Sequence, residues 1–443
     1  MPIGYTMIKG ISLHNFKSFD NIVLNLVDKG GRSMNHAFIY GENGCGKTNL
    51  IDSLMFLGRS TMTLLNERNR ASPDDTITKF IDLLRTEKID VRIRNEPMNV
   101  GELAKEYRMI DSEGTMGVAY RFEIDGHDAT YRLEFDEDDV LISERLDYVI
   151  SKNVGNLFEI TRDEKRIQKN LVSGDYRREL NNLLNRYWGN HTFIGILMNE
   201  SVMNNRSFFE SELSDNIRSF LRYIGSMVII KKDSRFVPNG RHIQLPSGFI
   251  KPSETGDLDS IQTILSKFFS RLYSDIKSVH FVREDAEDGR IRYSLYFDKR
   301  IAGKIRAIPA ENESSGTKNL MAILPYLLMC ADGRTVVIDE IDAGIHDLLV
   351  SQLISQCIPD ITGQLIATTH NTSLMTYRDA PNIFIISIDR KGYKDIASIQ
   401  STEPPNVKTN VQKRYMEGYY SGIPLAADIG LMDILRTSMK EGR

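Results

Sequence analysis

One glycine-rich loop constrains the fold of this sequence more than any other feature. Residues Gly41 to Thr48 read Gly-Glu-Asn-Gly-Cys-Gly-Lys-Thr and fit the P-loop pattern. A short apolar run, Ala37 to Tyr40, precedes the loop, and a segment with helical spacing, Asn49 to Leu57, follows it. A strand, a loop and a helix in that order are the context that the pattern requires. The sequence therefore predicts a phosphate-binding loop rather than a glycine-rich turn without a ligand.

The residue types in this loop indicate how a nucleotide would be held. Glycines let the backbone approach the phosphates, and the backbone N–H groups curl around them. We expect Lys47 to neutralise the β- and γ-phosphates and the Thr48 hydroxyl to bind Mg²⁺, so the expected ligands are ATP and Mg²⁺. The other predicted nucleotide contacts in this segment are Gly41, Asn43, Gly44, Cys45, Gly46 and Asn49.

Cys45 within the loop has two interpretations. The favoured one is a small side chain that fills space. The alternative is a reactive thiol whose pKa is lowered by the dipole of the following helix. For this alternative we predict that alkylation of the thiol blocks ATP binding and that bound ATP protects the thiol.

A second motif is an apolar strand that ends in an acidic pair, Thr335 to Glu340. Such a pair is by itself more typical of a solvated turn. In a chain that also carries a P-loop, we expect Asp339 to hold Mg²⁺ through water and Glu340 to act as the general base for an attacking water molecule.

Two shorter motifs complete the set. Ser and Gly at the start of a predicted helix near Lys318 form an anion site, because unpaired N–H groups and the helix dipole face the ligand. An ordinary N-cap is the alternative, and the order of the motifs favours nucleotide binding. A strand that ends in His370 places an imidazole where it would sense the γ-phosphate. The residues predicted at the anion site are Ser314, Ser315, Gly316 and Thr317.

The hydrophobic pattern predicts two kinds of sheet. Apolar residues alternate with polar ones from Val118 to Phe135, with an Asp125-Gly126 hairpin signal between two strands, which indicates an antiparallel sheet. From about residue 163 to residue 277 the pattern is mostly helical. Uniformly apolar strands then alternate with helices and predict a parallel sheet covered on both faces. These strands are Val336–Ile338, Leu365–Ala367 and Ile383–Ile386.

The P-loop, Glu-Ser-Ser-Gly-Thr, Asp-Glu-Ile-Asp and Thr-Thr-His motifs, in that order, resemble those of ABC-type ATPases of the SMC/RecF/OLD group. The segment Asn15–Phe19 is similar to the opening strand motif of that group, and this implies Lys17 as a nucleotide ligand. Ile345-His346 resembles the OLD-like ending, and the tail Lys413–Pro424 resembles the last segment of abortive-infection ATPases. The sequence is most similar to AbiL/RloA-type phage-defence ATPases, with the ATPase subunit of PARIS as a relative.

This resemblance implies an α/β fold of the P-loop NTPase class. The expected ABC-ATPase head has a mixed sheet flanked by helices, an antiparallel β subdomain and a helical insertion. The expected division is an N-terminal ATPase lobe at 1–160, a mainly helical insertion at 161–277 and a C-terminal ATPase lobe at 278–443. It also implies a head-to-tail homodimer, in which the P-loop of one copy faces Ser314 and Gly316 of the other. Lys47, Glu340 and His370 are the implied catalytic residues.

The composition restricts the classes of partner. The formal net charge of -4 over 443 residues gives no overall attraction to nucleic acid or to an anionic membrane. The three cysteines, Cys45, Cys330 and Cys357, form no zinc set, and this usage is typical of a reducing cytoplasm. The longest apolar run, Leu320 to Ala331, is too short to cross a bilayer. We therefore expect a cytoplasmic protein without a membrane partner.

The function implied by the resemblance is that of an ATPase subunit in a bacterial anti-phage system. It would sense infection through a phage-derived trigger and control a separate effector, such as a Toprim-type nuclease or another toxin. The chain ends soon after His370, so we expect no fused Toprim domain.

A RecF/SMC-like DNA repair or recombination ATPase is the alternative, and it would need a basic groove. The basic pairs are short and separated, as in solvated faces. A nucleotide-gated scaffold would not need the base Glu340, and a transporter ATPase has its signature motif much closer to the P-loop. The three basic pairs are Arg177-Arg178, Lys231-Lys232 and Lys299-Arg300.

Overall fold

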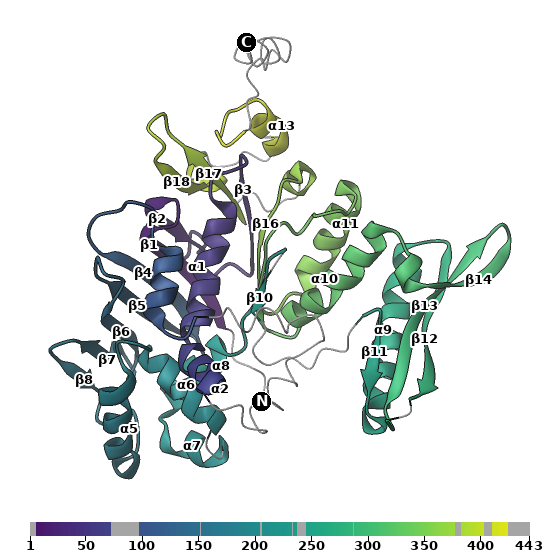
Figure 1. Cartoon of the computed structure of the whole chain (residues 1–443). Coiled ribbons are helices and arrows are strands. Elements are labelled where there is room, and N and C mark those ends of the chain that lie inside the picture. The colour runs from purple at the N-terminus through teal and green to yellow at the C-terminus, as the bar shows by residue number, and fades with distance from the viewer. Residues whose placement is uncertain are drawn as a thin grey trace, which may run out of the picture.

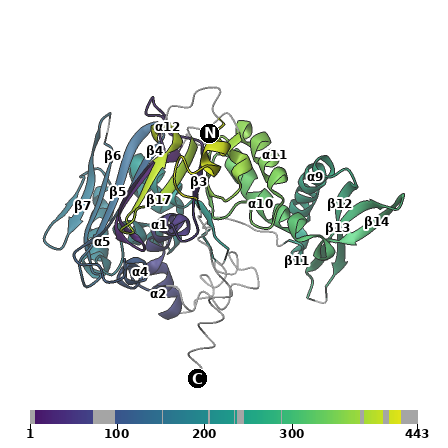
Figure 2. The same cartoon turned by 90° about the horizontal axis from the view of Figure 1, so that it is seen from above.

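The computed structural model describes residues 6–71, 97–150, 152–203, 206–232, 234–236, 245–286, 288–376, 382–402 and 410–423. A mixed sheet stands in the middle of the molecule. An antiparallel sheet with several helices lies on one side of it, and two long helices followed by a smaller β module lie on the other (Figure 1). The view from above shows the same arrangement (Figure 2).

The central sheet has its strands in the order β10-β9-β15-β16-β3-β17-β18. The inner strands from β9 to β17 run parallel, and the edge strands β10 and β18 are antiparallel to their neighbours. Every residue of β3, β15 and β16 is buried, because helices or sheets cover both faces. The bounds are β3 (His36–Gly41), β9 (Val228–Ile230), β10 (Arg235–Phe236), β15 (Thr335–Ile338), β16 (Gln364–Thr368), β17 (Ile383–Ile388) and β18 (Lys394–Ser398).

The second sheet is antiparallel, in the order β2-β1-β4-β5-β6-β7-β8. Burial along β4 alternates residue by residue, as in a sheet with one covered face. Asp125 and Gly126 have φ values of 51° and 77°, and this pair of positive values is typical of the two-residue hairpin turn that the sequence predicts. The bounds are β1 (Thr6–Phe16), β2 (Phe19–Asn25), β4 (Met116–Ile124), β5 (His127–Phe135), β6 (Leu141–Val149), β7 (Val154–Thr161) and β8 (Lys165–Ile167).

Helices fill the space between these two sheets and share one hydrophobic core with them. Helix α1, which follows the P-loop, lies in the middle of this core and is buried along most of its length. The bounds of the helices on this side are α1 (Lys47–Ser60), α2 (Thr63–Ala71), α4 (Val100–Tyr107), α5 (Gly174–Tyr187), α6 (Phe193–Met203), α7 (Arg206–Glu212) and α8 (Asp215–Ile224).

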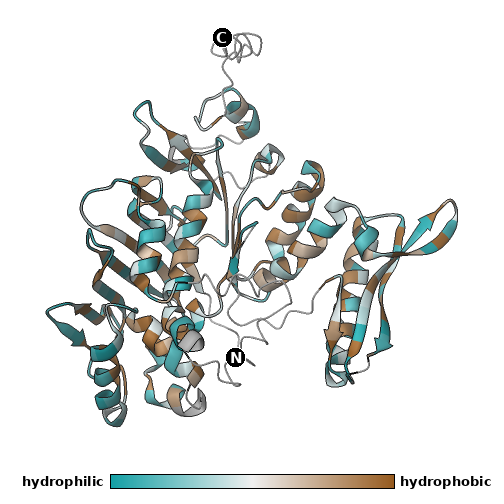
Figure 3. Ribbon diagram, in the orientation of Figure 1, coloured by the Kyte–Doolittle hydropathy of each residue, from teal (hydrophilic) through white to brown (hydrophobic). Residues whose placement is uncertain are grey.

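A second core covers the other face of the central sheet. It contains the apolar sides of α10 and α11, which Figure 3 colours as largely hydrophobic, together with α9 and the small sheet β11–β14. The longer elements here are β11 (Ser247–Ile250), α9 (Thr255–Leu272), β12 (Ile276–Asp285), β13 (Ile291–Ile301), β14 (Lys304–Pro309), α10 (Ser315–Ala331) and α11 (Asp347–Cys357). The short ones are η2 (Pro252–Glu254), η3 (Ala310–Asn312), η4 (Ile358–Asp360), η5 (Thr372–Thr376), α12 (Ile399–Thr402) and α13 (Val411–Met416).

The side chains of β3 show how one strand serves both cores. Ala37 and Ile39 belong to the core with α1, and Phe38 and Tyr40 belong to the core with α10. Successive side chains of a strand point to opposite faces, so a strand buried on both faces reads as a continuous apolar run. The apolar residues before the P-loop are explained by this position.

The predicted fold class, an α/β P-loop head with a mixed sheet, flanking helices and an antiparallel β subdomain, is confirmed. The stretch predicted as mostly helical contains α5 to α9 and also β9, which is a strand of the central sheet. Strand β7 crosses the expected boundary at residue 160, and the division into three parts stays a prediction. Among the described residues, no helix is both long and apolar enough to cross a membrane.

Candidate functional site

The P-loop connects β3 to α1 and depends on glycine at two close approaches. A Cβ atom at Gly41 would lie 2.5 Å from the Cys45 sulfur and 2.7 Å from the carbonyl oxygen of Ile386. A Cβ atom at Gly46 would lie 2.7 Å from the Phe19 ring, and φ at Gly46 is 110°. Larger side chains would therefore push the loop away from its supports.

Lys47 is the first residue of α1 and is buried, with 7% of its surface exposed. Its Nζ donates to the carbonyl oxygens of Gly41, at 2.8 Å, and Glu42, at 3.1 Å. Burial lowers the pKa of Lys47, whereas the nearby carboxylates of Asp339 and Glu340 act in the opposite direction. The ammonium is thus held inside the loop, where phosphate oxygens could replace the carbonyl acceptors.

The two residues predicted to hold the metal lie side by side. The Thr48 hydroxyl donates to Oδ2 of Asp339 at 2.9 Å, although 291 positions separate them. Oδ1 of Asp339 accepts from Thr368 at 2.6 Å. One hydroxyl and one carboxylate fit Mg²⁺, which prefers oxygen ligands and takes the rest from water and phosphates. The described residues contain no cluster of three or more His, Cys, Asp or Glu suited to a metal ion.

Glu340 has an uncommon backbone conformation, with φ of 54°. Its backbone N–H donates to the Thr368 hydroxyl at 2.7 Å, and this bond fixes the turn after β15. A positive φ in a residue with a long side chain is strained and is often found at functional sites. The carboxyl of Glu340 is exposed and lines an open pocket.

The pocket has a volume of about 340 Å³, and three of the predicted site residues line it: Asn43, Glu340 and His370. The backbone N–H of His370 donates to Oδ2 of Asp342 at 3.2 Å, while Oδ1 of Asp342 is buried and has no partner among the described residues. Sequence reasoning missed Asp342, although it belongs to the Asp-Glu-Ile-Asp motif. The pocket is lined by Asn43, Glu340, Asp342, Ala343 and His370.

The predicted anion site lies apart from the P-loop. Ser314 is the N-cap of α10, and its hydroxyl accepts from the N–H of Thr317 at 3.1 Å. Ser314 and Ser315 are exposed, and Gly316 is half-buried. Among the described residues, no hydrogen bond or ion pair joins residues 313–317 to residues 41–49. The start of α10 is therefore open to an external ligand.

A buried ion pair connects the Glu-Ser-Ser-Gly-Thr motif to the neighbouring β module. Glu313 precedes the N-cap, and its side chain is only 2% exposed. Oε2 of Glu313 lies 2.7 Å from Nζ of Lys299 on β13, and Oε1 has no partner among the described residues. The position of the motif therefore depends on the β11–β14 module.

The turn between β1 and β2 packs against the P-loop helix, but not through the predicted ligand. Nζ of Lys17 lies over the Tyr107 ring, 4.7 Å from its centroid, and a role for Lys17 in nucleotide binding stays a prediction. The hydroxyl of Ser18 accepts from the Asn49 amide at 2.7 Å. Nζ of Lys394 donates to the Gly44 carbonyl oxygen at 3.1 Å. Sequence reasoning missed Lys394 as a neighbour of the P-loop, because Lys394 belongs to no motif and β18 is distant in sequence from the loop.

Cys45 is fully buried. Burial raises the pKa of its thiol, and Lys47 only partly opposes this shift. The structure therefore agrees with the interpretation of a small buried side chain, and the alternative of a thiol with a lowered pKa is wrong.

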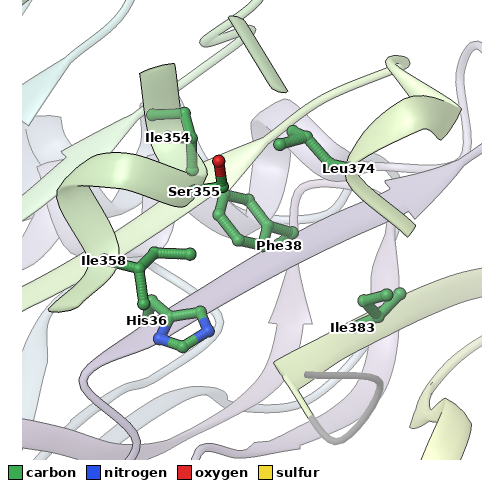
Figure 4. A pocket seen from close by; sticks show the side chains of 7 residues that line it. All are labelled: His36, Phe38, Ile354, Ser355, Ile358, Leu374 and Ile383. Atoms are coloured by element: carbon green, nitrogen blue, oxygen red, sulfur yellow. The ribbon is translucent and has the colours of Figure 1, made fainter. Parts of the chain in front are cut away.

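A second pocket, between α11, β3, η5 and β17, is too small for a ligand. It is lined by His36, Phe38, Ile354, Ser355, Ile358, Leu374 and Ile383 (Figure 4). Its volume of about 10 Å³ is room for roughly one water molecule.

Comparisons with known proteins give one family and a group of solved structures. The family model AAA_21, described as "AAA domain, putative AbiEii toxin, Type IV TA system", matches residues 37–376. This range includes the P-loop, Glu-Ser-Ser-Gly-Thr, Asp-Glu and Thr-Thr-His motifs. No curated protein matches the chain.

The solved structures are SMC heads with low sequence identity. The SMC head bound to the C-winged helix domain of ScpA is 18% identical, has a TM-score of 0.40, and the match covers 89% of this chain and 98% of that one. The SMC head domain from Thermotoga maritima is 15% identical, with a TM-score of 0.38 and coverage of 89% and 99%. The Smc head bound to the C-terminal domain of ScpA from Pyrococcus furiosus is 18% identical, with a TM-score of 0.40 and coverage of 89% and 96%.

Proposed function

The chain belongs to the AAA_21 family, and we propose that it binds and hydrolyses ATP as a homodimer with two shared active sites. The observation that carries this proposal is the contact of Thr48 with Asp339, at 2.9 Å. Three groups needed for phosphoryl transfer to water are then close together: the phosphate-binding loop, the oxygen ligands for Mg²⁺ and a free carboxylate.

In the proposed reaction, water attacks the γ-phosphorus of ATP while the bond from that phosphorus to the β–γ bridging oxygen breaks. Glu340 accepts a proton from the water, and ADP leaves with the bridging oxygen. Lys47 and the N–H groups at the start of α1 stabilise the developing charge. Mg²⁺, held by Thr48 and Asp339, would neutralise charge on the phosphates.

The exposed start of α10 supports the proposed dimer. Ser314 and Ser315 are exposed and, among the described residues, make no hydrogen bond to the P-loop of the same chain, so they could complete the site of a second copy. A helix N-terminus suits the negative charge of a γ-phosphate. In the ATP-bound dimer, each site would combine the P-loop of one copy with the α10 start of the other.

A mixing experiment tests the shared sites. Lys47→Met removes the P-loop cation, and Gly316→Glu puts a carboxylate into the anion site. Each variant alone should hydrolyse almost no ATP. An equimolar mixture should recover about a quarter of wild-type activity, because half of the dimers are mixed and each of these has one intact site. No recovery, with both variants folded, would contradict the shared site.

We further propose that ATP-driven assembly controls a separate effector in a bacterial anti-phage, abortive-infection system. The family description, which refers to an AbiEii toxin and a type IV TA system, supports a role of this class. We propose a protein effector, such as a Toprim-type nuclease or another toxin, and a phage-derived trigger.

The DNA-repair alternative has less support from the charges. Lys231 is paired with Asp52, and Lys299 is paired with Glu313, so two of the three basic pairs in the sequence have a lysine committed to an acidic partner. The remaining pair, Arg177-Arg178, lies on α5 and is too short for a groove.

The mass of Glu340→Gln in solution tests this assembly, because the variant should bind ATP without hydrolysing it. On its own, the variant should be monomeric without ATP-Mg²⁺ and dimeric with it. A second measurement adds the protein encoded by the neighbouring gene, the candidate effector, and ATP-Mg²⁺ should then give a larger complex. Phage infection should then release the effector. An unchanged mass despite measured ATP binding would contradict ATP-driven assembly.

A further inference from the structure

The last described segment, residues 410–423, lies against the ATP site. We call this segment the C-terminal strap. It begins with α13 and then continues as a turn. Val411, Tyr415 and Tyr420 of the strap are buried in the second core. Figure 1 shows α13 beyond the ends of β3 and β17, on the side from which the P-loop emerges.

The strap contacts the strand that leads into the P-loop. The ring of Tyr415 packs edge-on against the ring of Tyr40, with centroids 5.9 Å apart. The hydroxyl of Tyr415 donates to the carbonyl oxygen of Gly422 at 2.9 Å and closes the strap into a loop. Tyr40 is the residue directly before Gly41, so this contact fixes the base of the P-loop.

Gly422 packs directly against the first residue of the P-loop. A Cβ atom at Gly422 would lie 3.5 Å from Cα of Gly41 and 2.7 Å from Cγ2 of Ile385. It would also lie 3.1 Å from the carbonyl oxygen of Ile386. Gly41 has the same Ile386 carbonyl oxygen as a close neighbour. The backbones of the strap, the P-loop and β17 therefore meet at a point with no room for a side chain.

The strap also contacts the loop that carries His370. Nε2 of Gln412 donates to the Thr372 hydroxyl at 3.1 Å. The hydroxyl of Tyr40, whose ring packs against Tyr415, donates to the carbonyl oxygen of Asn371 at 2.9 Å. The strap therefore contacts Tyr40, directly before Gly41, and Thr372, two residues after His370.

We propose that the strap is a positioning element of the ATP site, with Gly422 and Tyr415 as its positioning residues. It holds the P-loop at the distance from His370 at which both reach the same γ-phosphate. Neither residue touches the pocket, so the effect acts through Gly41 and Asn371. This inference deepens the proposed function and rests on it, because the strap is assigned to the ATP site.

Two glycines of the strap provide a matched pair of variants. Gly422 and Gly418 have φ values of 72° and 84°, so alanine is strained at either position. A Cβ atom at Gly418 has nothing within 4 Å. Gly422→Ala and Gly418→Ala therefore share the backbone strain, and only Gly422→Ala adds crowding against Ile385 and the Ile386 carbonyl oxygen, which is also a close neighbour of Gly41.

We expect Gly422→Ala to raise the dissociation constant of ATP about tenfold, because a small displacement of the loop misaligns several N–H groups at once. Gly418→Ala should bind ATP as the wild type does. Tyr415→Phe, which removes only the bond to Gly422, should raise KM a few-fold more than it lowers kcat. Its unchanged thermal stability would separate this effect from unfolding.

Hydrogen exchange of residues 36–50 without nucleotide makes the test independent of ATP binding. Faster exchange there in Gly422→Ala than in Gly418→Ala supports the proposal. Equal exchange and equal affinity in these two variants would overturn it. A wild-type chain that binds no ATP would contradict the proposed function instead, and the exchange comparison would still decide whether the strap holds the loop.

Discussion

Two buried glutamates, on opposite faces of the central sheet, differ in how completely their carboxylates are hydrogen-bonded. On the side of α1, Glu144 of β6 accepts four hydrogen bonds, from the Tyr131 hydroxyl, the Trp188 indole N–H and the backbone N–H groups of Phe193 and Ile194. On the side of α10, one lysine binds Glu313, and the second carboxylate oxygen has no partner among the described residues.

This difference indicates which half of the ATP site is preformed. A fully bonded carboxylate stiffens its surroundings, whereas a half-satisfied one costs free energy until another donor arrives. The P-loop side is therefore built within one chain. At the start of α10, Ser314 and Ser315 are exposed, and in the proposed dimer they would contact the second copy.

The largest effect should come from the preformed half. Lys47→Met should weaken ATP binding by about 100-fold, the equivalent of roughly 3 kcal/mol for charge-assisted hydrogen bonds. Calorimetric titration with a slowly hydrolysed ATP analogue measures it. Lys267→Met, an exposed lysine on α9, is the control and should bind normally. Strong binding by Lys47→Met would mean that this half is not the nucleotide site.

The next largest effect concerns the start of α10 and the ion pair beside it. Lys299→Met should lower the free energy of unfolding by about 2–3 kcal/mol, because it leaves the buried Glu313 carboxylate without a cation. Its ATP affinity as a monomer should be unchanged, and its hydrolysis should fall. Denaturant unfolding and ATPase assays measure both.

The control for Lys299→Met is Arg290→Met, in the same module. Arg290 and its partner Asp288 are each 49% exposed, so this variant should lose no more than about 0.5 kcal/mol. Equal losses in the two variants would show that the Glu313 pair has no special role.

A smaller effect is a pH dependence of the stability, caused by Glu144 on the side of α1. Burial raises the pKa of Glu144 to about 6, against its ordinary value of 4.5, although hydrogen bonds oppose the shift. A folded-state pKa above the unfolded one means that this contribution to stability is full below pH 4.5 and is lost as the pH rises through 6. The loss at pH 7 is about 2 kcal/mol.

Glu144→Gln cannot titrate at this position and serves as the reference. Thermal melting of both proteins between pH 4.5 and pH 7.5 should show a wild-type stability that falls relative to that of the variant. If the difference in stability between the two proteins stays constant across this range, Glu144 keeps one protonation state. The contrast between Glu144 and Glu313 would then rest on their hydrogen bonds alone.

The smallest effect is kinetic. Because burial raises the pKa of the Cys45 thiol, iodoacetamide at pH 8 should modify it about tenfold more slowly in the native chain than in the unfolded chain. ATP-Mg²⁺ should slow the reaction further, and the modified protein should not bind ATP. Peptide mass spectrometry measures the rate, and a modified protein with full ATP affinity would contradict the tight loop around Gly41.

Local sequence was sufficient for the parts of the site that lie within one strand–loop–helix unit. The P-loop, the Asp339-Glu340 pair and the Thr-Thr-His strand are each a short apolar run followed by a polar turn, and both features depend on nearby residues. The Asp125-Gly126 hairpin was equally predictable, since its positive φ values suit those two residues.

The sequence did not reveal short elements and distant partners. Strand β9 has only three residues, too few to show a period, and it is a strand because β10 and β15 pair with it. The ion pair of Lys299 with Glu313 and the bond from Lys394 to Gly44 join residues whose identities are common on any solvated surface.

What the sequence by itself determined is therefore the set of candidate groups: the loop expected to bind phosphate, the carboxylates expected to serve the metal and the water, and the histidine expected to face them. Only the tertiary structure decided how these groups are held. Gly422 of the strap lies against Gly41 although more than 370 positions separate them in the sequence. Such a contact depends on close packing in the folded chain, and this packing leaves no local pattern in the sequence around either residue.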